Sequence, residues 1–353
     1  MKYKKILYLV YLIFIFYIFS CSLDQDSVYN KYKPGTYKMI EVPVPLGGIT
    51  FPIGIDDDDT ATINNIYYIG ETQVTFALWQ AVAYWATFEK KGGYYDYIYW
   101  EPHGYQNDSH IDYPICGITY IQALIWCNAY TEWHNEKYGT NYTPVYIDES
   151  GNPIRSAREP KGPSDSMVQD LYIYLMHHPM MKNYFDNIET KGDGFRLPTP
   201  NEWELAARWR GSNSINSVKK EINGIDFDNY PYKFTIGNAV SGANNHVGNL
   251  QECNKYAVFY ENSFGNLSLP KTKMPNALNI YDMSGNLREY VYNVEWKEVQ
   301  VGLLPWNKAE LQFAETKGGY FDDLYYQISI GYGIFINLAL YNYYYGFRVA
   351  RNK

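Results

Sequence analysis

The second half of the chain constrains the fold most. Beyond residue 211, short apolar runs alternate with Gly and Asn turns, and no long helical period or internal repeat occurs. Three clear helical patterns lie before that point, so the chain holds few helices within much irregular structure. This arrangement is typical of an α+β domain with low regular secondary structure. The chain has no GxGxxG or P-loop sequence and no alternating strand and helix pattern, which argues against the common nucleotide-binding folds.

Three threonines mark the expected helix starts. Thr75 precedes a helix expected over 76–87. Thr119 has Gln three residues later, which makes a capping box, and Gly139 supplies the stop signal at the end of that helix. Thr199 is followed by Pro at the first helical position and by Glu202 at the capping-box position. We expect these three helices to be the most reliable elements of the fold.

The N-terminus predicts an exported lipoprotein. A basic start is followed by the apolar run Ile6 to Phe19 and then by Ser20 and Cys21. This order is that of an export signal. Residues 18–21 resemble a relaxed lipobox, the recognition sequence of bacterial lipoproteins, whose Cys is acylated. The run of roughly 14 apolar residues is shorter than the ~20 that a membrane helix needs, although an uncleaved anchor and plain secretion stay open. We therefore expect a signal peptide over 1–21, lipidation at Cys21, a tether over 22–41 and a domain over 42–353.

Charge and cysteine content limit the partners. The formal net charge is −8, and loss of the three signal lysines lowers it to −11, which disfavours nucleic acid and acidic lipids. We expect the protein in the cell envelope, held at the outer or inner membrane by its lipid. Export also exposes the chain to oxidising conditions. After acylation of Cys21, the remaining Cys116, Cys127 and Cys253 allow at most one disulfide.

Six short motifs occur along the chain in a specific order and spacing. They are Gly70–Thr75, Ala123–Ala129, Arg196–Glu204, Asp282–Asn286, Lys317–Gly319 and Gly346–Arg348. Together they resemble the formylglycine-generating enzyme family, also called sulfatase-modifying factors. The resemblance implies one domain over nearly the whole mature chain, with a C-type-lectin-like variant fold.

The resemblance implies one structural calcium site. Asp282, the carbonyls of Gly285 and Leu287, and Glu289 follow the spacing of a calcium motif of that family. Hard oxygen ligands of this kind are those that Ca²⁺ prefers. The alternative is a simple Gly-Asn turn followed by a solvated Glu, because the Trp residues that flank this Glu in the family are replaced here. The acidic cluster of the family's second calcium site is not found in this chain.

The resemblance also places a catalytic centre that this chain lacks. In the family, two Cys after the Gly-Gly pair bind copper(I), which is used with oxygen to convert a sulfatase Cys into formylglycine. Aligned on Gly318-Gly319, these positions hold Asp323 and Ile328. Copper(I) selects soft thiolates, so we expect no copper and no formylglycine synthesis. Whether the chain has another enzymatic activity stays open, and we favour a non-enzyme.

Other chemistries find little support. Related enzymes, the ergothioneine-type sulfoxide synthases, hold non-haem iron with three His. The six His of this chain do not form the His-x3-His-x-Glu sequence of those enzymes. Asp322 and Asp323 are adjacent, so on extended chain their carboxylates point to opposite faces rather than forming an acid/base pair. Cys127 lies in an expected helix, where a core role is favoured over a nucleophilic one.

The residues between the Gly-Gly and Gly-Phe-Arg motifs are rich in aromatic side chains, which are typical of recognition surfaces. The alternative is that many are core residues, or reflect a genome rich in A and T. All residues of 320–345 except Gln327 can arise from Asn codons by adenine-directed mutation, as in retroelement-diversified variable regions, which this segment resembles. The candidate ligand surface comprises Tyr320, Asp322, Asp323, Tyr325, Tyr341, Tyr343 and Tyr345.

These observations favour an exported, lipid-anchored binding or display protein on a degenerate enzyme scaffold. Its ligand would be an unknown protein or glycan. The alternatives are a structural or assembly lipoprotein of an envelope machine and an enzyme of unknown chemistry.

Overall fold

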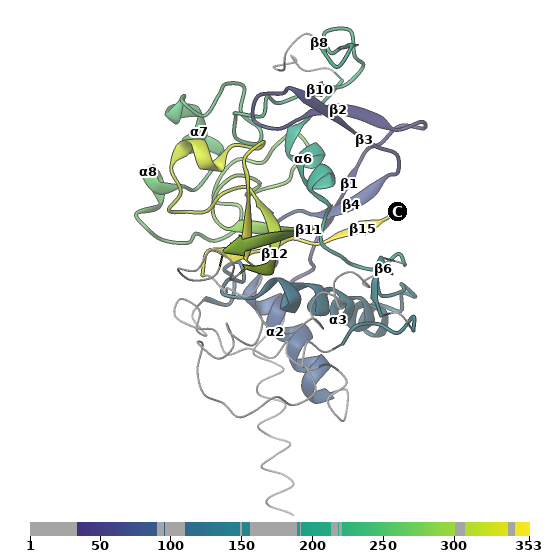
Figure 1. Cartoon of the computed structure of the whole chain (residues 1–353). Helices are drawn as coiled ribbons and strands as arrows, with labels where there is room; N and C mark the ends of the chain where they lie inside the picture. The colour runs from purple at the N-terminus through teal and green to yellow at the C-terminus, as the bar shows by residue number, and fades with distance from the viewer. Residues whose placement is uncertain are drawn as a thin grey trace, which may run out of the picture.

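The computed structural model describes most of the expected domain (Figure 1). The expected signal peptide, Cys21, most of the tether and Tyr341 lie outside the described residues. Within the described part, no helix is long and apolar enough to cross a membrane. The described residues are 34–89, 95, 110–148, 150–155, 189–190, 192–212, 218, 221–300, 308–337 and 343–353.

Two long helices form a layer at one end of the molecule. They are α2 (Phe76–Tyr84), which continues as the π-helix η1 (Trp85–Glu89), and α3 (Tyr120–Tyr138) (Figure 1). The expected caps are confirmed: Thr75 and Thr119 accept from backbone N–H groups of the first turn, and Gly139 closes α3 in the left-handed region at φ 68°. An αL glycine of this kind leaves the last carbonyls of a helix satisfied. The π-helical turn at the end of α2 was not expected from the sequence.

A three-stranded sheet joins the two ends of the described chain. Its order is β1-β4-β15, all antiparallel, with β1 over Met39–Val42, β4 over Tyr67–Gly70 and β15 over Ala350–Asn352. The expected domain boundary at residue 42 therefore falls inside a strand, and the sheet already includes residues 39–41. The C-terminus is fixed by this pairing.

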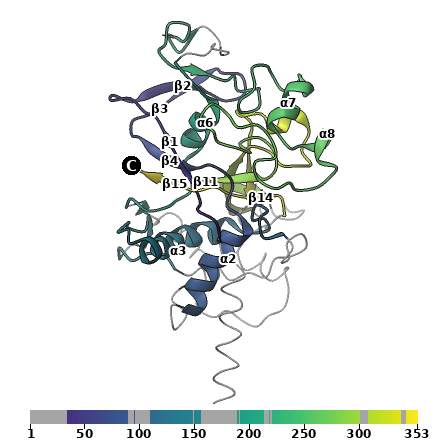
Figure 2. The ribbon, with the colours of Figure 1, turned by 180° about the vertical axis from the view of Figure 1, so that it is seen from behind.

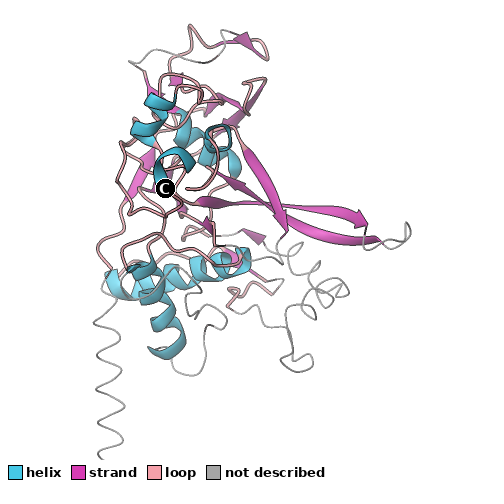
Figure 3. Ribbon diagram, turned by 90° about the vertical axis from the view of Figure 1, so that its left-hand side faces the viewer, coloured by secondary structure: helices cyan, strands magenta, loops and turns pink. Residues whose placement is uncertain are grey.

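The largest sheet contains a long hairpin. Its order is β13-β12-β11-β14. Here β11 (Arg288–Gln300) and β12 (Lys308–Lys317) pair over most of their length, β13 (Gly333–Asn337) pairs with β12, and β14 (Tyr345–Gly346) lies parallel to β11. Figure 3 shows the two long strands projecting well beyond the body of the protein. We expected only short runs here, and the polar and apolar alternation from Tyr292 to Lys297 is the strand signal that was missed.

The remaining elements are short and linked by turns, which confirms the expected α+β fold of low regular content. Figures 1 and 2 place α7 and α8 on the side of the molecule opposite β2 and β3. These elements are β2 (Ile49–Ile53) with β3 (Asp59–Ile63), β5 (Tyr146–Ile147) with β6 (Glu189–Thr190), β7 (Trp209–Gly211) with β10 (Lys233–Phe234), β8 (Glu221–Ile222) with β9 (Ile225–Asp226), and α6 (Pro200–Arg208), α7 (Leu250–Tyr256), α8 (Tyr260–Ser263), η3 (Tyr325–Ile328), β13 (Gly333–Asn337) and β14 (Tyr345–Gly346).

Aromatic packing ties the helical layer to the C-terminal motif. Trp79 of α2 stacks on Trp126 of α3 with ring centroids 5.5 Å apart, and Phe347 meets Trp126 edge-on at 5.4 Å. All three side chains are fully buried. Edge-on and stacked pairs of this kind contribute about 0.5–1.5 kcal/mol beyond the area they bury. The Gly-Phe-Arg motif is thereby held at a fixed place between the helical layer and the sheets.

Candidate functional site

Two glycines start the segment that carries the candidate ligand surface. Gly318 and Gly319 have φ of 88° and 70°, a region that other residues enter only with strain. A Cβ on Gly319 would also lie 2.7 Å from the Gln327 carbonyl oxygen. The segment therefore doubles back on itself at this point, and the turn requires glycine for both conformation and space.

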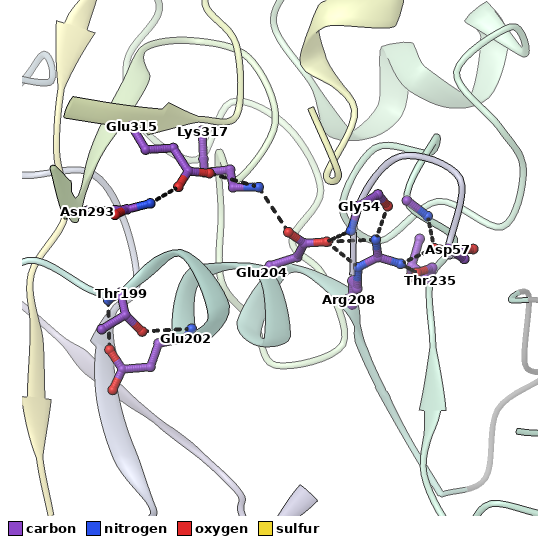
Figure 4. Close-up of polar contacts among 11 residues, drawn as sticks. Gly54, Asp57, Thr199, Glu202, Glu204, Arg208, Thr235, Asn293, Glu315 and Lys317 are labelled. Carbon is purple, nitrogen blue, oxygen red and sulfur yellow. Dashed lines mark hydrogen bonds and ion pairs between the residues drawn. The ribbon is translucent and has the colours of Figure 1, made fainter. Parts of the chain in front are cut away.

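A buried ion network fixes the strand that leads into these glycines (Figure 4). Lys317 Nζ lies 3.0 Å from Glu204 Oε2, and Arg208 of α6 pairs with Glu204 Oε1 at 2.7 Å. Arg208 also pairs with Asp57 at 2.6 Å, so one guanidinium joins α6 to the loop after β2. Buried charges are stable only when paired and hydrogen-bonded in this way. The network explains why the Lys-Gly-Gly motif includes a buried lysine.

Glu289, an expected calcium ligand, is paired with an arginine. Its carboxylate is fully buried and accepts hydrogen bonds from Arg348 Nε and Nη2, both at 2.7 Å. Trp203 Nε1 donates to it at 2.8 Å and Gln73 Nε2 at 3.0 Å. A bidentate Arg–carboxylate pair with two further donors satisfies this carboxylate. The Gly-Phe-Arg, Asn-Glu-Trp and Gly-Glu-Thr-Gln motifs thus meet at one residue.

The other residues of the expected calcium motif face the same donors. The Leu287 carbonyl accepts from Gln73 Nε2 at 2.8 Å, and the Asp282 carbonyl accepts from Arg348 Nη2 at 3.2 Å. Gly285 has φ 75° and packs tightly against Val258.

Asp282 itself is buried, and its Oδ2 accepts from the Lys271 backbone N–H at 3.0 Å. Burial raises the pKa of this carboxyl to about 6, with the Lys271 hydrogen bond and Arg348 opposing.

This geometry does not fit a calcium ion as it stands. The positive charge opposite Glu289 is supplied by Arg348, and the Gln73 amide nitrogen lies where the carbonyl of Leu287 and the Glu289 carboxylate converge. Calcium requires about six to eight free oxygen ligands. Within the described residues, no group of three or more His, Cys, Asp or Glu is arranged to hold a metal ion. The geometry therefore does not support the calcium expected at this motif, and its binding stays untested.

The two positions that align with the family's copper thiolates carry very different side chains. Asp323 is buried and forms an ion pair with Arg288, and its Oδ2 also accepts from the Tyr320 backbone N–H at 3.0 Å. Burial raises the pKa of Asp323 although Arg288 opposes the shift. Ile328 is fully buried in an apolar cluster that includes Cys253. Neither position offers a soft ligand.

The three described cysteines lie in the core. Cys116, Cys127 and Cys253 are buried and none forms a disulfide. Burial raises the pKa of the Cys116 thiol to about 12 and that of Cys253 to about 11, with Glu252 adding to the latter. Thiols of this kind are inert because the thiolate is the reactive form. The core role expected for Cys127 agrees with its complete burial.

Aromatic rings cover the Arg288–Asp323 pair. The Arg288 guanidinium carbon lies 5.9 Å from the centre of the Tyr320 ring and 5.7 Å from that of Tyr332. Tyr320 stacks on Tyr344 at 4.4 Å, and all three rings are half-buried. Burial and the neighbouring Asp323 raise the pKa of Tyr320 to about 12, so its hydroxyl is neutral and can donate. Arg288 was not among the expected site residues.

The structure divides the remaining expected surface residues into two groups. Asp322 and Tyr325 are exposed, as the opposite orientation of Asp322 and Asp323 predicted. Tyr343 and Tyr345 are half-buried, and Tyr345 packs against Tyr290 with ring centroids 5.7 Å apart. The segment is therefore neither a fully open aromatic face nor a closed core.

Exposed apolar side chains extend this surface beyond the expected residues. Leu324, Tyr325 and Tyr326 are 39–47% exposed in succession. The Tyr260 N–H of α8 donates to the Asp323 carbonyl at 3.1 Å, and Tyr260 is itself 57% exposed. We call Tyr260, Leu324, Tyr325 and Tyr326 the exposed aromatic patch. Tyr260 was missed because it lies some 60 residues upstream, and only the folded backbone brings it close.

Sequence comparison identifies the family. The model of the sulfatase-modifying factor enzyme 1-like domain (FGE-sulfatase) matches residues 35–353. The chain belongs to the sulfatase-modifying factor family. No sequence among the curated proteins matches it. The family match starts before β1, in agreement with a domain that includes residues 39–41.

Solved structures confirm the fold of this family member. Treponema denticola variable protein 1 is similar with 21% identity and a TM-score of 0.56, over 91% of this chain and 97% of that one. CarF is similar with 20% identity and a TM-score of 0.56, over 90% of this chain and 99% of that one. At these identities the likeness shows the fold alone.

Proposed function

We propose that this protein is an exported, lipid-anchored binding or display protein that uses the sulfatase-modifying factor scaffold without copper-dependent cysteine oxidation. Two features support the absence of that reaction. Asp323, at one thiolate position, is engaged by Arg288, and Ile328, at the other, is part of the apolar core. The described thiols occupy neither position, and burial raises the pKa values of Cys116 and Cys253.

The observation that carries the binding role is the exposed aromatic patch on a fixed frame. Leu324, Tyr325 and Tyr326 are exposed, whereas Ile328, Ser329 and Ile330 immediately after them are fully buried. The backbone beneath the patch is therefore held in place, so a ligand does not have to order it. Rigid aromatic side chains on a preorganised loop are effective binding elements.

One structural neighbour, with a likeness in fold alone, is described as a variable protein. This description supports the idea that the segment 320–345 is a diversified region in this chain as well. A near-identical template copy beside a reverse transcriptase in the genome would support diversification, and its absence would contradict it.

The experiment that tests the function is affinity capture from envelope fractions with matched variants. We expect the double variant Tyr325→Ser/Tyr326→Ser to lose capture of the partner that the unaltered protein retains. The variant Tyr138→Ser at the end of α3 removes an equally exposed tyrosine elsewhere and should keep it. Capture of a stoichiometric complex that does not depend on Tyr325 would instead favour the structural or assembly role. A redox-active metal at unit occupancy in the purified protein would contradict the non-enzyme proposal.

A further inference from the structure

Arg288 has a buried donor without a partner. Its side chain is 2% exposed, its Nη2 pairs with Asp323, and its Nη1 has no hydrogen-bond partner among the described residues. An unsatisfied buried donor costs about 1–3 kcal/mol, and more on a charged group, so such atoms call for an explanation. One explanation is an acceptor that arrives with a ligand.

The surroundings decide the charge of that acceptor. Arg288 contributes one positive charge, whereas Asp323 beside it and the exposed Asp322 contribute two negative ones. Glu261, which follows Tyr260 on α8, is exposed as well. An anionic ligand would therefore meet a net negative site on a chain of net charge −8. An uncharged acceptor suits the free Nη1, and a carbonyl oxygen is the strongest such acceptor that proteins carry.

The surface around Arg288 decides the class of partner. The exposed aromatic patch adjoins it, because the Asp323 backbone holds Tyr260 on one side and leads into Leu324 on the other. Phe264 at the end of α8 is 91% exposed. Leucine and phenylalanine favour apolar protein side chains over sugar hydroxyls. Exposed apolar side chains of this kind, surrounded by polar residues, are typical of protein interfaces.

We propose that Arg288 is the polar anchor of a protein-binding surface, where its Nη1 donates to an uncharged carbonyl of a basic partner that packs on the exposed aromatic patch. This inference rests on the proposed binding function and names its partner class. The partner's positive charge complements Asp322 and Glu261, and the amide oxygen of its Asn or Gln side chain satisfies the buried donor.

Access to Nη1 requires a tyrosine ring to move. Tyr320 and Tyr332 cover the guanidinium and are only half-buried, so their outer edges already reach the surface. Tyr332 lies between Gly331 and the exposed Gly333, so the two residues adjacent to it in the chain have no side chain that could restrict its ring. Rotation of exposed side chains is fast on the time scale of binding.

The test uses the whole chain in detergent and a random linear peptide library displayed on phage. We expect the selected peptides to combine apolar and basic residues with Asn or Gln. Their affinity should fall about tenfold on Arg288→Lys, which keeps the charge opposite Asp323 but loses the fork of donors. The double variant Arg288→Met/Asp323→Asn should show the same loss without leaving a buried charge unpaired. Unfolding temperatures of both variants are checked first.

Arg351→Lys is the matched control. Arg351 also lies against two tyrosine rings, 4.9 Å from Tyr68 and 4.3 Å from Tyr142, but on β15. Its replacement should leave peptide affinity unchanged. A double-mutant cycle separates recognition of the peptide from structural support. In the peptide of this cycle, Asn or Gln is replaced by Leu. This replacement should lower the affinity about tenfold for the unaltered protein and leave it unchanged for Arg288→Lys.

Several results would overturn the inference. They are an affinity of both Arg288 variants that equals that of the unaltered protein, selection of acidic peptides, an equal loss on Arg351→Lys, absence of coupling in the cycle, or an empty selection. If capture from envelope fractions depends on Tyr325 and Tyr326 while Arg288→Lys changes nothing, the binding function stands and this inference fails. If neither capture nor peptide binding is found, both fail.

Discussion

Glu289 shows how single residues in this fold depend on partners far along the chain. Its position and acidic character were expected from the sequence, as was its proximity to Asp282 and Leu287. Its partners were not: Gln73 lies 216 residues away, Trp203 86 and Arg348 59. Local spacing identifies a cluster of potential ligands, but only the fold reveals which cation or donor they face. Arg288 was missed for the same reason, since its role depends on Asp323 and on two distant tyrosines.

The substitution Glu289→Gln tests this buried pair. It leaves the Arg348 guanidinium buried without a countercharge, so we expect the free energy of unfolding to fall by about 3–5 kcal/mol. Urea denaturation followed by tryptophan fluorescence measures it. The control is Glu41→Gln, which removes a carboxylate from an exposed pair with Lys353 at 3.0 Å and should change stability far less, because solvent screens exposed charges. Equal effects of the two substitutions would contradict the importance of burial here.

At the scale of elements, local signals predicted helix starts well and strands poorly. The N-caps at Thr75, Thr119 and Thr199 and the Gly139 stop depend on residues within one turn, so the sequence contains the whole signal. The hairpin of β11 and β12 depends on pairing between separate segments, and the bulge between Tyr290 and Val294 interrupts its alternation. The long hairpin was therefore not predicted.

The turn at Gly319 is the element that places the ligand surface, and Gly319→Ala tests it. The new Cβ would meet the Gln327 carbonyl at 2.7 Å and Ile328 Cγ2 at 2.8 Å, at φ 70°. We expect a loss clearly greater than the ~1–2 kcal/mol of the left-handed conformation alone. Gly211→Ala is the matched control, because its φ is 80° and no atom lies within 4 Å of the new Cβ. Urea unfolding of both variants measures the difference. Similar losses in the free energy of unfolding of the two variants would show that the turn can adjust to accept a Cβ at residue 319.

For the whole molecule, the order of short motifs was more informative than any regular element. Each motif is brief, but all six reach buried positions or contacts that hold the scaffold together, such as Phe347 between the helices and Lys317 in the ion network. The fold and family were therefore predictable. The exposure of individual tyrosines in 320–345 was not, because the same residue type packs half-buried against the core at Tyr345 and lies exposed at Tyr325.

Chelation of divalent cations tests how the whole domain is stabilised. The buried Arg348 supplies the positive charge opposite Glu289, so we expect EDTA to leave the unfolding temperature of the protein unchanged, and added calcium to raise it little. A bound structural ion would instead stabilise by about 2.7 kcal/mol at a hundredfold excess over its dissociation constant. Differential scanning calorimetry with EDTA, calcium and magnesium provides the measurement, and Glu289→Gln shows whether any effect depends on this motif. A drop in unfolding temperature with EDTA that calcium restores, and that Glu289→Gln abolishes, would show that calcium displaces Arg348 from the carboxylate.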